Sequence, residues 1–338
     1  MAVGIDIGSK TVKMIELVKN GQNWELKGSG IIGYKGTTPD KAVEERELIS
    51  LADVIRKLHK EANISSKDVR ISLPEQAVFT RTIKFPLLTD QEIAAAIKWE
   101  AEQYIPIPVS EAIIQHQILE RRETSTPPEV VVLLVAAPRK LVENYVKVVT
   151  LAGLNVIGVE TELIALTRAL APQGKTVLLL DFGAGSTDIA IAKNRSLMFS
   201  RSVPTAGEAF TRAVAQTLGV EYQQAEQYKK AYGLSTTQLE GRIKGALDPV
   251  FKMVTDEVKK AVQFYLSEEK GESPTSVILS GGTSGMPDAL SLLTKTLGYE
   301  VLIANPFTYV SLSPEVAKSI LPFAPLYSIA VGLALGGE

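Results

Sequence analysis

The feature that most constrains the fold is an acidic, glycine-rich turn that occurs twice in the chain. Residues 178–189 read Leu-Leu-Leu-Asp-Phe-Gly-Ala-Gly-Ser-Thr-Asp-Ile, so an apolar strand leads into Asp181 and then into a turn with two glycines. Residues 4–11 repeat this order of strand, acid, glycine and hydroxyl around Asp6. A single copy is typical of an ordinary β-turn, whereas two copies predict two similar halves that each contribute one turn.

The residue types in these turns favour a polyphosphate ligand. Small residues let backbone N–H groups approach a phosphate closely, whereas a carboxylate repels phosphate and requires a divalent cation between the two. Because each half brings one turn, we expect the polyphosphate to lie between the halves.

The composition narrows the remaining classes of protein. With 338 residues and 45% hydrophobic content, the chain can bury a core large enough for two domains or more. Its net charge of −2 gives no basic field for nucleic acid. The lack of cysteine excludes disulfides, thiolate catalysis and cysteine metal sites, and His59 and His116 have no evident metal-ligand partners.

No basic region precedes the first apolar strand, so the N-terminus does not resemble a secretory signal. The longest apolar runs fall short of the ~20 residues that a membrane span requires. We therefore expect a cytoplasmic protein that meets a membrane only through a partner.

Hydrophobic periodicity predicts two copies of a three-strand unit, each followed by helices. The strands are expected at 3–7, 12–17, 24–34, 177–180, 188–193 and 197–203. Between the copies, a block at about 77–153 has its own β-α-β-β-α order, and its first helix begins with a capping box of Thr89 and Glu92. We expect a first domain of 1–76, 154–175 and 324–338, and a second domain of 176–323 with a helical portion at about 219–270.

Two further segments carry small residues. Ser280-Gly281-Gly282-Thr283 follows a short apolar strand, and such a turn lets a flat ring or a ribose lie against bare backbone, although a plain strand-to-helix turn is the alternative. The segment 326–335 predicts close packing, for which a hinge helix and a core helix fit equally well.

Together, the segments 6–8, 181–187 and 280–283 resemble the nucleotide-binding core shared by actin, sugar kinases, heat-shock chaperone ATPases and FtsA. In that superfamily they look like the phosphate 1, phosphate 2 and adenosine motifs, and 160–165 and 324–335 resemble the two connecting helices. The resemblance implies an α/β, actin-like (ribonuclease H-like) duplicated two-domain ATPase fold.

A closer resemblance, over nearly the full length, is to the FtsA-related PilM family of type IV pilus assembly. It is carried by 4–9 with Val12-Lys13, by Phe85-Pro86, and by 101–106 and 180–184. The block at about 77–153 also lies where FtsA and PilM proteins place their 1C subdomain, so an FtsA-type 1C subdomain is implied.

This resemblance implies ATP or ADP with Mg²⁺ as the ligand, with Asp6 and Asp181 holding the metal through water. The residues that would lie against phosphates or adenosine are Gly8, Ser9, Lys10, Thr11, Gly183, Gly185, Ser186, Thr187, Gly281, Gly282 and Thr283. Glu226 and Lys229 resemble the FtsA segment that touches ribose, although an i,i+3 pair of this kind is also typical of a solvated salt bridge.

The implied partner is PilN, an inner-membrane protein whose short cytoplasmic N-terminal peptide PilM-type proteins bind in a groove beside subdomain 1C. We place the groove lining at Phe85, Ile97, Trp99, Tyr104 and Ile105. The alternative is that these side chains pack the core of the subdomain itself. The implied location is the cytoplasmic face of the inner membrane, and other pilus assembly proteins and self-association stay open.

Two other functions also stay open. A small-molecule (sugar) kinase would need a carboxylate base, for which Asp188 is the nearest candidate, although strand alternation equally fits a structural role. A filament-forming FtsA-like or actin-like ATPase would act through contacts that one sequence does not display. FtsA ends in a membrane-targeting amphipathic helix, and the ending Gly336-Gly337-Glu338 favours a borrowed anchor. For the adaptor we expect at most slow ATP turnover.

Overall fold

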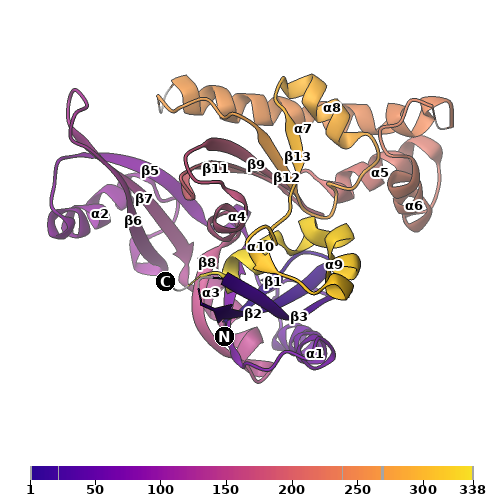
Figure 1. Ribbon diagram of the computed structural model, residues 1–338, viewed down its shortest axis with the longest axis horizontal. Coiled ribbons are helices and arrows are strands. Elements are labelled where there is room, and N and C mark those ends of the chain that lie inside the picture. The colour runs from indigo at the N-terminus through magenta and orange to yellow at the C-terminus, as the bar shows by residue number, and fades with distance from the viewer. Residues whose placement is uncertain (1, 22, 238, 268–269, 337–338) are drawn as a thin grey trace.

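The computed structural model describes residues 2–21, 23–237, 239–267 and 270–336, and it arranges them around three sheets (Figure 1). The first sheet has the strand order β14-β3-β2-β1-β4-β8, the second has the order β11-β10-β9-β12-β13, and a small third sheet has the order β5-β7-β6. Each large sheet contains a meander of three antiparallel strands, β1-β2-β3 or β9-β10-β11. The predicted duplication is therefore confirmed.

The first sheet is buried on both faces. Its elements are β1 (Ala2–Ile7), β2 (Thr11–Asn20), β3 (Asn23–Gly33), β4 (Asp68–Leu73), β8 (Asn155–Thr161), β14 (Val310–Ser311), α1 (Glu45–Glu61), α3 (Arg139–Leu151), α9 (Pro314–Ile320), the 3₁₀ segment η4 (Leu321–Tyr327) and α10 (Ser328–Ala334). Val3 and Ile5 of β1 pack with α1 and α3, whereas Ile15 and Leu17 of β2 pack with η4 and α10. The period of two along a strand places these sets on opposite faces.

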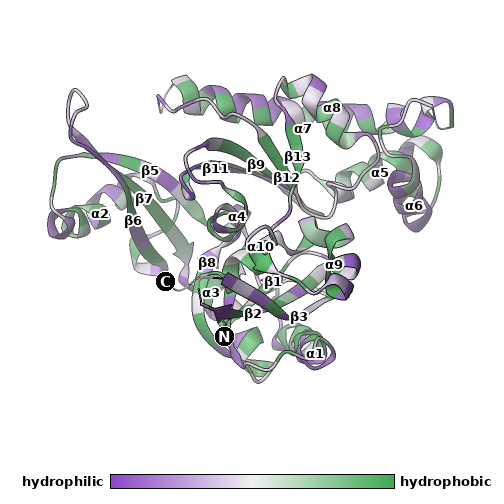
Figure 2. Ribbon diagram, in the orientation of Figure 1, coloured by the Kyte–Doolittle hydropathy of each residue, from purple (hydrophilic) through white to green (hydrophobic). Residues whose placement is uncertain are grey.

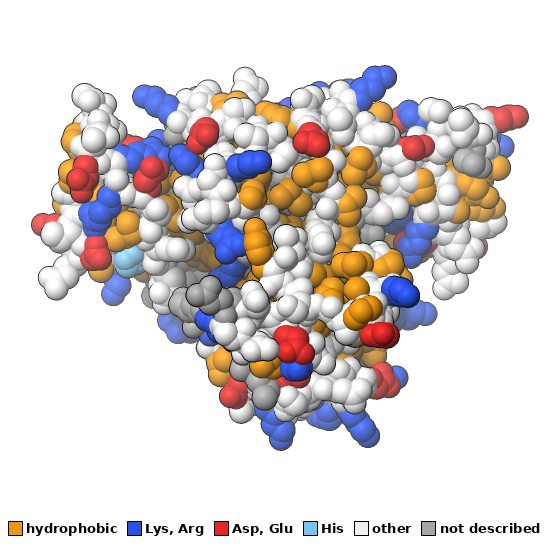
Figure 3. All heavy atoms as spheres, viewed as in Figure 1, with side chains coloured by type: hydrophobic (Ala, Val, Ile, Leu, Met, Phe, Trp, Pro, Cys, Tyr) orange, Lys and Arg blue, Asp and Glu red, His pale blue; other side chains and the backbone are white. Residues whose placement is uncertain are grey.

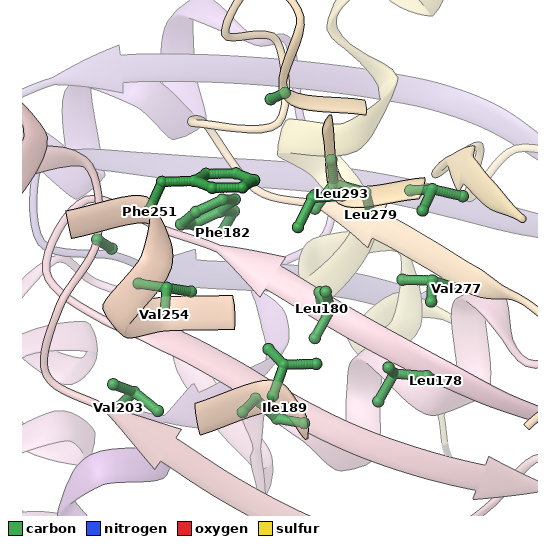
Figure 4. Close-up of a cluster of buried hydrophobic side chains, with 14 of the residues drawn as sticks. Leu178, Leu180, Phe182, Ile189, Val203, Phe251, Val254, Val277, Leu279 and Leu293 are labelled. Atoms are coloured by element: carbon green, nitrogen blue, oxygen red, sulfur yellow. The ribbon is translucent and has the colours of Figure 1, made fainter. Parts of the chain in front are cut away.

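The second sheet is covered by a long helix on one face. Its elements are β9 (Thr176–Phe182), β10 (Thr187–Lys193), β11 (Ser196–Val203), β12 (Val277–Ser280), β13 (Val301–Ile303), α5 (Gly207–Leu218), α6 (Tyr222–Tyr232), η3 (Leu239–Gly241), α7 (Arg242–Ser267) and α8 (Ala289–Leu297). Leu178 and Ile189 belong to one cluster with Val254 of α7 (Figure 4). Leu179 packs instead with Leu163 of α4 (Glu162–Leu170), which lies on the other face.

Helices α4 and α10 pack against each other between the two large sheets (Figure 1). A Cβ added to Gly332 of α10 would lie 1.9 Å from the Ala165 carbonyl oxygen of α4, so the two backbones are in direct contact. Arg168 Nη1 donates to the Gly332 carbonyl oxygen at 2.8 Å. Close packing was predicted for 326–335, and glycine is what permits the approach.

The apolar run Pro314–Ala334 is, within the described part of the chain, the one helical stretch long and apolar enough to cross a membrane by length and composition. It combines α9, η4 and α10, and every residue of α10 is buried inside the protein. Figure 2 shows apolar colouring along α10, β9 and β12, and hydrophilic colouring over much of α6. We therefore interpret the run as core packing, because a buried core helix passes the same test.

The small sheet and one helix form a separate subdomain on the side of the molecule (Figure 1). Its elements are η1 (Glu75–Ala77), β5 (Phe79–Pro86), α2 (Asp90–Tyr104), η2 (Val109–Glu111), β6 (Ala112–Arg122) and β7 (Glu129–Pro138). The predicted capping box is present, because the Thr89 hydroxyl accepts from the Glu92 amide and the Glu92 carboxylate accepts from the Thr89 amide at 2.8 Å.

Two predicted domain boundaries are corrected by the packing. Helix α3 was expected in the block at about 77–153, but its residues Tyr145 and Val148 lie in the core between α1 and the first sheet. The segment 307–323 was expected in the second domain, but β14 pairs with β3 and Phe307 packs against the first sheet. Both errors have the same cause. Local periodicity predicts helices and strands, but it does not predict which distant strand or sheet each of them packs against.

Candidate functional site

The first turn closes between β1 and β2 and holds a buried acid. Asp6, at the end of β1, is only 2% exposed, and the Gly8 amide donates to the Thr11 carbonyl at 3.1 Å to close the turn. Lys13 Nζ lies 2.9 Å from Asp6 Oδ2, whereas Asp6 Oδ1 is buried without a hydrogen-bond partner. One carboxylate oxygen is thus free to bind a further group.

The second turn repeats this geometry between β9 and β10. Asp181 is half-buried near the end of β9, and the Gly183 amide donates to the Ser186 carbonyl at 3.0 Å. The amides of Gly207 and Glu208, at the start of α5, donate to the carbonyls of the second turn at 3.2 and 2.8 Å. The second turn and the start of α5 therefore form one rigid unit.

The two turns meet between the two halves of the molecule. A Cβ added to Gly185 would lie 3.2 Å from Ser9 Oγ, and Lys10 Nζ forms an ion pair with Glu208 Oε1 at 2.7 Å. Burial raises the pKa of Asp181 to about 7, with further increases from the Asp188 and Asp6 carboxylates and an opposing effect of the Lys13 ammonium. Asp6 and Asp181 thus face the same junction.

Two charged residues in this junction were not predicted from the sequence. Lys13 neutralises Asp6 directly, and the half-buried Glu162 at the start of α4 faces the same acids. Burial raises the pKa of Glu162 well above its usual range, and Asp188, Asp6 and Asp181 raise it further. The signal for Lys13 was its position two residues after the turn in a strand, which places it on the same face as Thr11.

The hydroxyl residues of the second turn have mixed roles. Thr187 is 1% exposed and donates to the Thr205 carbonyl at 2.7 Å, and Ser186 donates to Asp188 Oδ2 at 2.9 Å. Their side chains are engaged in the protein, so an approaching phosphate would meet the backbone amides of the turn first. Ser9, Lys10 and Thr11 of the first turn keep at least partial exposure.

The Gly-Gly segment at Gly281 and Gly282 lies against the second turn. Gly281 has a φ of +88°, and a Cβ there would lie 2.5 Å from the Phe182 carbonyl oxygen and 2.8 Å from Asp181 Oδ1. Thr283 Oγ1 donates to the Gly183 carbonyl at 2.7 Å. Only glycine fits this conformation and this space, so the fold requires a residue without a side chain next to Asp181. A Cβ on Gly282 would lie 3.4 Å from the Leu326 side chain.

The pair of Glu226 and Lys229 is not a solvated salt bridge. Lys229 is 6% exposed, and Nζ donates to the Gly207 carbonyl, Thr211 Oγ1 and Glu226 Oε2 at 3.0, 2.9 and 2.7 Å. All three protons of its ammonium are used within the protein. Lys229 therefore fixes α6 to the start of α5, and Glu226 is the partly exposed member of the pair.

The residues predicted to line a peptide groove separate into two groups. Phe85, Ile97 and Ile105 are 6%, 3% and 8% exposed and belong to the core of the small subdomain, so the structure corrects their assignment to an open groove. The cause is the helical period, which turns position 97 of α2 onto the small sheet. Trp99 is 74% exposed, and Tyr104 is half-buried with the Arg81 guanidinium 4.2 Å from its ring centre.

The residues at the junction fit a Mg²⁺-bound polyphosphate. Asp6 Oδ1 is a buried acceptor without a hydrogen-bond partner. Burial disfavours the charged form of the Asp181 carboxyl, which a bound cation would stabilise. Glycines leave the backbone of both turns without side chains. Within the described residues, no group of three or more acidic, histidine or cysteine side chains forms a complete metal cage. Two carboxylates with phosphate and water as the other ligands are what Mg²⁺ commonly takes.

Asp188 is a buried carboxylate whose ionised form is destabilised by its surroundings. It is 3% exposed and accepts hydroxyl hydrogen bonds from Ser186 and Ser202. Burial raises its pKa to about 7, while Ser202 and Ser186 lower it and Glu75 raises it. Because the unfolded carboxyl has a pKa near 3.9, the folded state binds this proton more tightly, and stability is lost as the pH rises from about 4 to about 7.

Replacing Asp188 with asparagine should therefore make the protein more stable above pH 7. We expect Asp188→Asn to raise the free energy of unfolding at pH 8 by about 2 kcal/mol, since a three-unit pKa shift corresponds to at most about 4 kcal/mol. Urea denaturation at pH 5 and pH 8 measures this, and Asp53→Asn on the exposed face of α1 is the control. A variant that is less stable than the wild type at pH 8 would show that the charged form is needed.

Two meanders that each end in an acidic glycine turn, joined through a pair of packed helices, bring both acids to one junction. This architecture defines an actin-like protein, in the class of FtsA, MreB and related ATPases. The sequence profile of the family described as Type IV pilus assembly protein PilM matches residues 4–338. The chain belongs to this family, and it is an actin-like protein of type IV pilus assembly.

Individual relatives agree with this assignment. A solved structure of a PilM-PilN type IV pilus biogenesis complex is similar at 27% identity with a TM-score of 0.85, over 99% of this chain and 97% of that chain. The cell division protein FtsA of Pseudomonas aeruginosa is 24% identical over 384 residues, which cover 100% of this chain and 89% of FtsA. MreB5 of Spiroplasma citri bound to ADP shares the fold, with a TM-score of 0.55 at 13% identity over 98% and 94% of the two chains.

Proposed function

We propose that the protein is a nucleotide-binding adaptor of the type IV pilus assembly complex. It binds ATP or ADP with Mg²⁺ at the junction of its two turns, and it binds the cytoplasmic N-terminal peptide of a PilN-type partner through its small subdomain. The observation that supports the first part best is the convergence of Asp6 and Asp181, one from each half, beside bare glycine backbone. An actin-like relative, MreB5, is bound to ADP.

Each residue at the junction has a role in this proposal. Asp6 and Asp181 hold Mg²⁺ through water, and the cation supplies the positive charge that lets phosphate approach the two acids. The residues that cradle the phosphates are Gly8, Ser9, Lys10, Thr11, Gly183, Gly185, Ser186 and Thr187, mainly through backbone N–H groups. Gly281, Gly282 and Thr283 form the surface for adenosine, and Glu226 accepts from the ribose.

The small subdomain supplies the partner site. Trp99 on α2 and Leu87 before it are 74% and 46% exposed, so both apolar side chains are accessible to a partner. A hollow of about 700 Å³ lies at the start of α2, and its lining is Leu87, Leu88, Thr89, Asp90, Gln91, Arg121 and Glu123. A short peptide with apolar anchors fits such a surface. Because PilN is the partner in the similar complex, this site ties the protein to the inner face of the membrane.

We expect Trp99→Ala to weaken binding of a synthetic PilN N-terminal peptide by about tenfold or more, because tryptophan is among the residues that most often dominate the binding energy of such contacts. Fluorescence anisotropy of a labelled peptide measures this. The matched control is Phe323→Ala, which removes a 55% exposed aromatic ring from η4. Hydrophobic side chains also gather near η4, over β13 and α9 (Figure 3), so the control alters a comparable apolar surface. Equal peptide affinity in wild type and Trp99→Ala would reject this part of the site.

The base candidate of the kinase alternative is engaged within the protein. Asp188 was the nearest candidate, but it is 3% exposed and both of its oxygens accept from serine hydroxyls. A general base must reach the hydroxyl of its substrate, and this carboxylate is buried on the α4 side of the second sheet with both oxygens engaged. Titration calorimetry with MgATP, followed by an assay for sugar phosphorylation, separates the two functions. Binding without phosphorylation supports the adaptor, and rapid sugar phosphorylation supports the kinase.

A further inference from the structure

An ion pair joins the first turn to the start of α5, across the boundary between the two halves of the molecule. Lys10 belongs to the first turn, and its Nζ lies 2.7 Å from Glu208 Oε1 across the boundary between the two halves. Glu208 is fixed to the second turn, because its own amide donates to the Ala184 carbonyl at 2.8 Å. The ion pair therefore holds one turn against the other.

The same contact occupies a cation that the proposed nucleotide site needs. Lys10 is one of the residues assigned to the phosphates, and its pKa is raised mainly by its hydrogen bond to Glu208. At the neighbouring position, Ser9 Oγ lies 3.2 Å from where a Cβ on Gly185 would be, so the turns are in contact there. A polyphosphate that enters between the turns must separate them and take Lys10 from the carboxylate.

The surroundings of Glu208 make this exchange feasible. The Lys10 and Glu208 side chains are 56% and 30% exposed, and ion pairs in contact with solvent are weak. Arg212, one turn further along α5, has Nη1 3.7 Å from Glu208 Oε2. Glu208 thus keeps a positively charged neighbour when Lys10 leaves, whereas Lys10 gains a ligand with several negative charges.

We propose that Glu208 is an internal competitor for the polyphosphate and that the Lys10–Glu208 ion pair is the gate of the nucleotide site. With the pair formed, the turns are held together. When the phosphates of a nucleotide bind Lys10, the pair breaks, and Glu208 turns to Arg212 while the turns separate. This inference rests on the proposed nucleotide function, and it adds Glu208 as a residue that opposes nucleotide binding.

The test is a double-mutant cycle in nucleotide binding, measured by stopped flow with a fluorescent ATP analogue and Mg²⁺. We expect Glu208→Gln to raise the association rate constant and the affinity about three- to fivefold at low salt, since an exposed ion pair has about that strength. The gain should shrink at high salt, because screening already weakens the pair. Lys10→Met should weaken binding, and in that background Glu208→Gln should have no further effect.

A matched control separates the gate from a general change in charge. Glu300→Gln removes the same charge from an exposed position before β13, and it should leave binding unchanged. An unchanged or lower affinity for Glu208→Gln would overturn the gate, and so would an undiminished gain in the Lys10→Met background, because either result shows that Glu208 does not act through Lys10. Failure of the wild-type protein to bind the analogue at all would instead overturn the nucleotide site itself. Urea denaturation of each variant confirms that the fold is intact.

Discussion

Gly332→Ala is expected to destabilise the protein by more than about 3 kcal/mol, because overpacking that the backbone cannot relieve is among the most costly substitutions. The new methyl carbon would lie 1.9 Å from the Ala165 carbonyl oxygen, which belongs to the backbone of α4 and cannot rotate away. Helices α4 and α10 would have to move apart, and the Arg168 hydrogen bond to Gly332 would be strained with them. Because both large sheets pack on these helices, the loss should appear as one cooperative transition.

The control for Gly332→Ala is a glycine in a helix that has space. A Cβ on Gly245 of α7 would meet nothing within 4 Å, so Gly245→Ala should stabilise the protein by about 0.5–1 kcal/mol through helix propensity. Urea denaturation monitored by circular dichroism gives both values. Equal stability of Gly332→Ala and the wild type would show that α4 and α10 do not approach as closely as they do here.

The second large effect is expected from Asp181→Ala on nucleotide binding. With Mg²⁺ present, the affinity for ATP should fall about 10- to 100-fold, which is the range for residues that hold a metal through an outer shell. In EDTA the effect should reverse in sign, because removal of a carboxylate from the junction lowers its repulsion of the phosphates. Titration calorimetry under both conditions measures the two affinities, and Asp53→Ala on α1 is the control.

The pH dependence of binding gives an independent test of Asp181. Since its pKa is about 7 in the folded protein, lowering the pH below 7 protonates the carboxyl that the metal requires. The affinity of the wild type for MgATP should therefore rise as the pH increases from 6 to 8, and this rise should be smaller in Asp181→Ala. The same loss of ATP affinity with and without Mg²⁺ would contradict the assigned metal role.

Local sequence signals predicted the duplicated architecture well. The helix that begins after Thr89 follows from its capping box. The strand pairs on either side of each acidic turn follow from the period-two hydrophobic pattern of the strands. These features depend on neighbours in sequence, so one chain contains enough information to predict them.

Features that depend on contacts between residues far apart in the sequence were harder to predict. Lys229 and Thr187 were expected to meet the ligand, but both side chains are engaged with distant carbonyl groups of the protein. Phe85 and Ile97 were expected in a groove, yet they pack on the small sheet. The acid partner of Lys10 is 198 positions away in the printed sequence, and only the fold brings Glu208 to it. A residue's type suggests what it can bind, whereas the tertiary structure decides what it does bind.

The most direct test of the shared site places a paramagnetic ion in it. Mn²⁺ with ATP should occupy the position proposed for Mg²⁺, and its unpaired electrons broaden the NMR signals of amides close to it. The amide signals of Gly8 in the first turn and Gly183 in the second should both disappear at substoichiometric Mn²⁺, while the amide of Gly245 in α7 persists. Loss of signal at only one of the two turns would contradict a metal and nucleotide site that both halves build together.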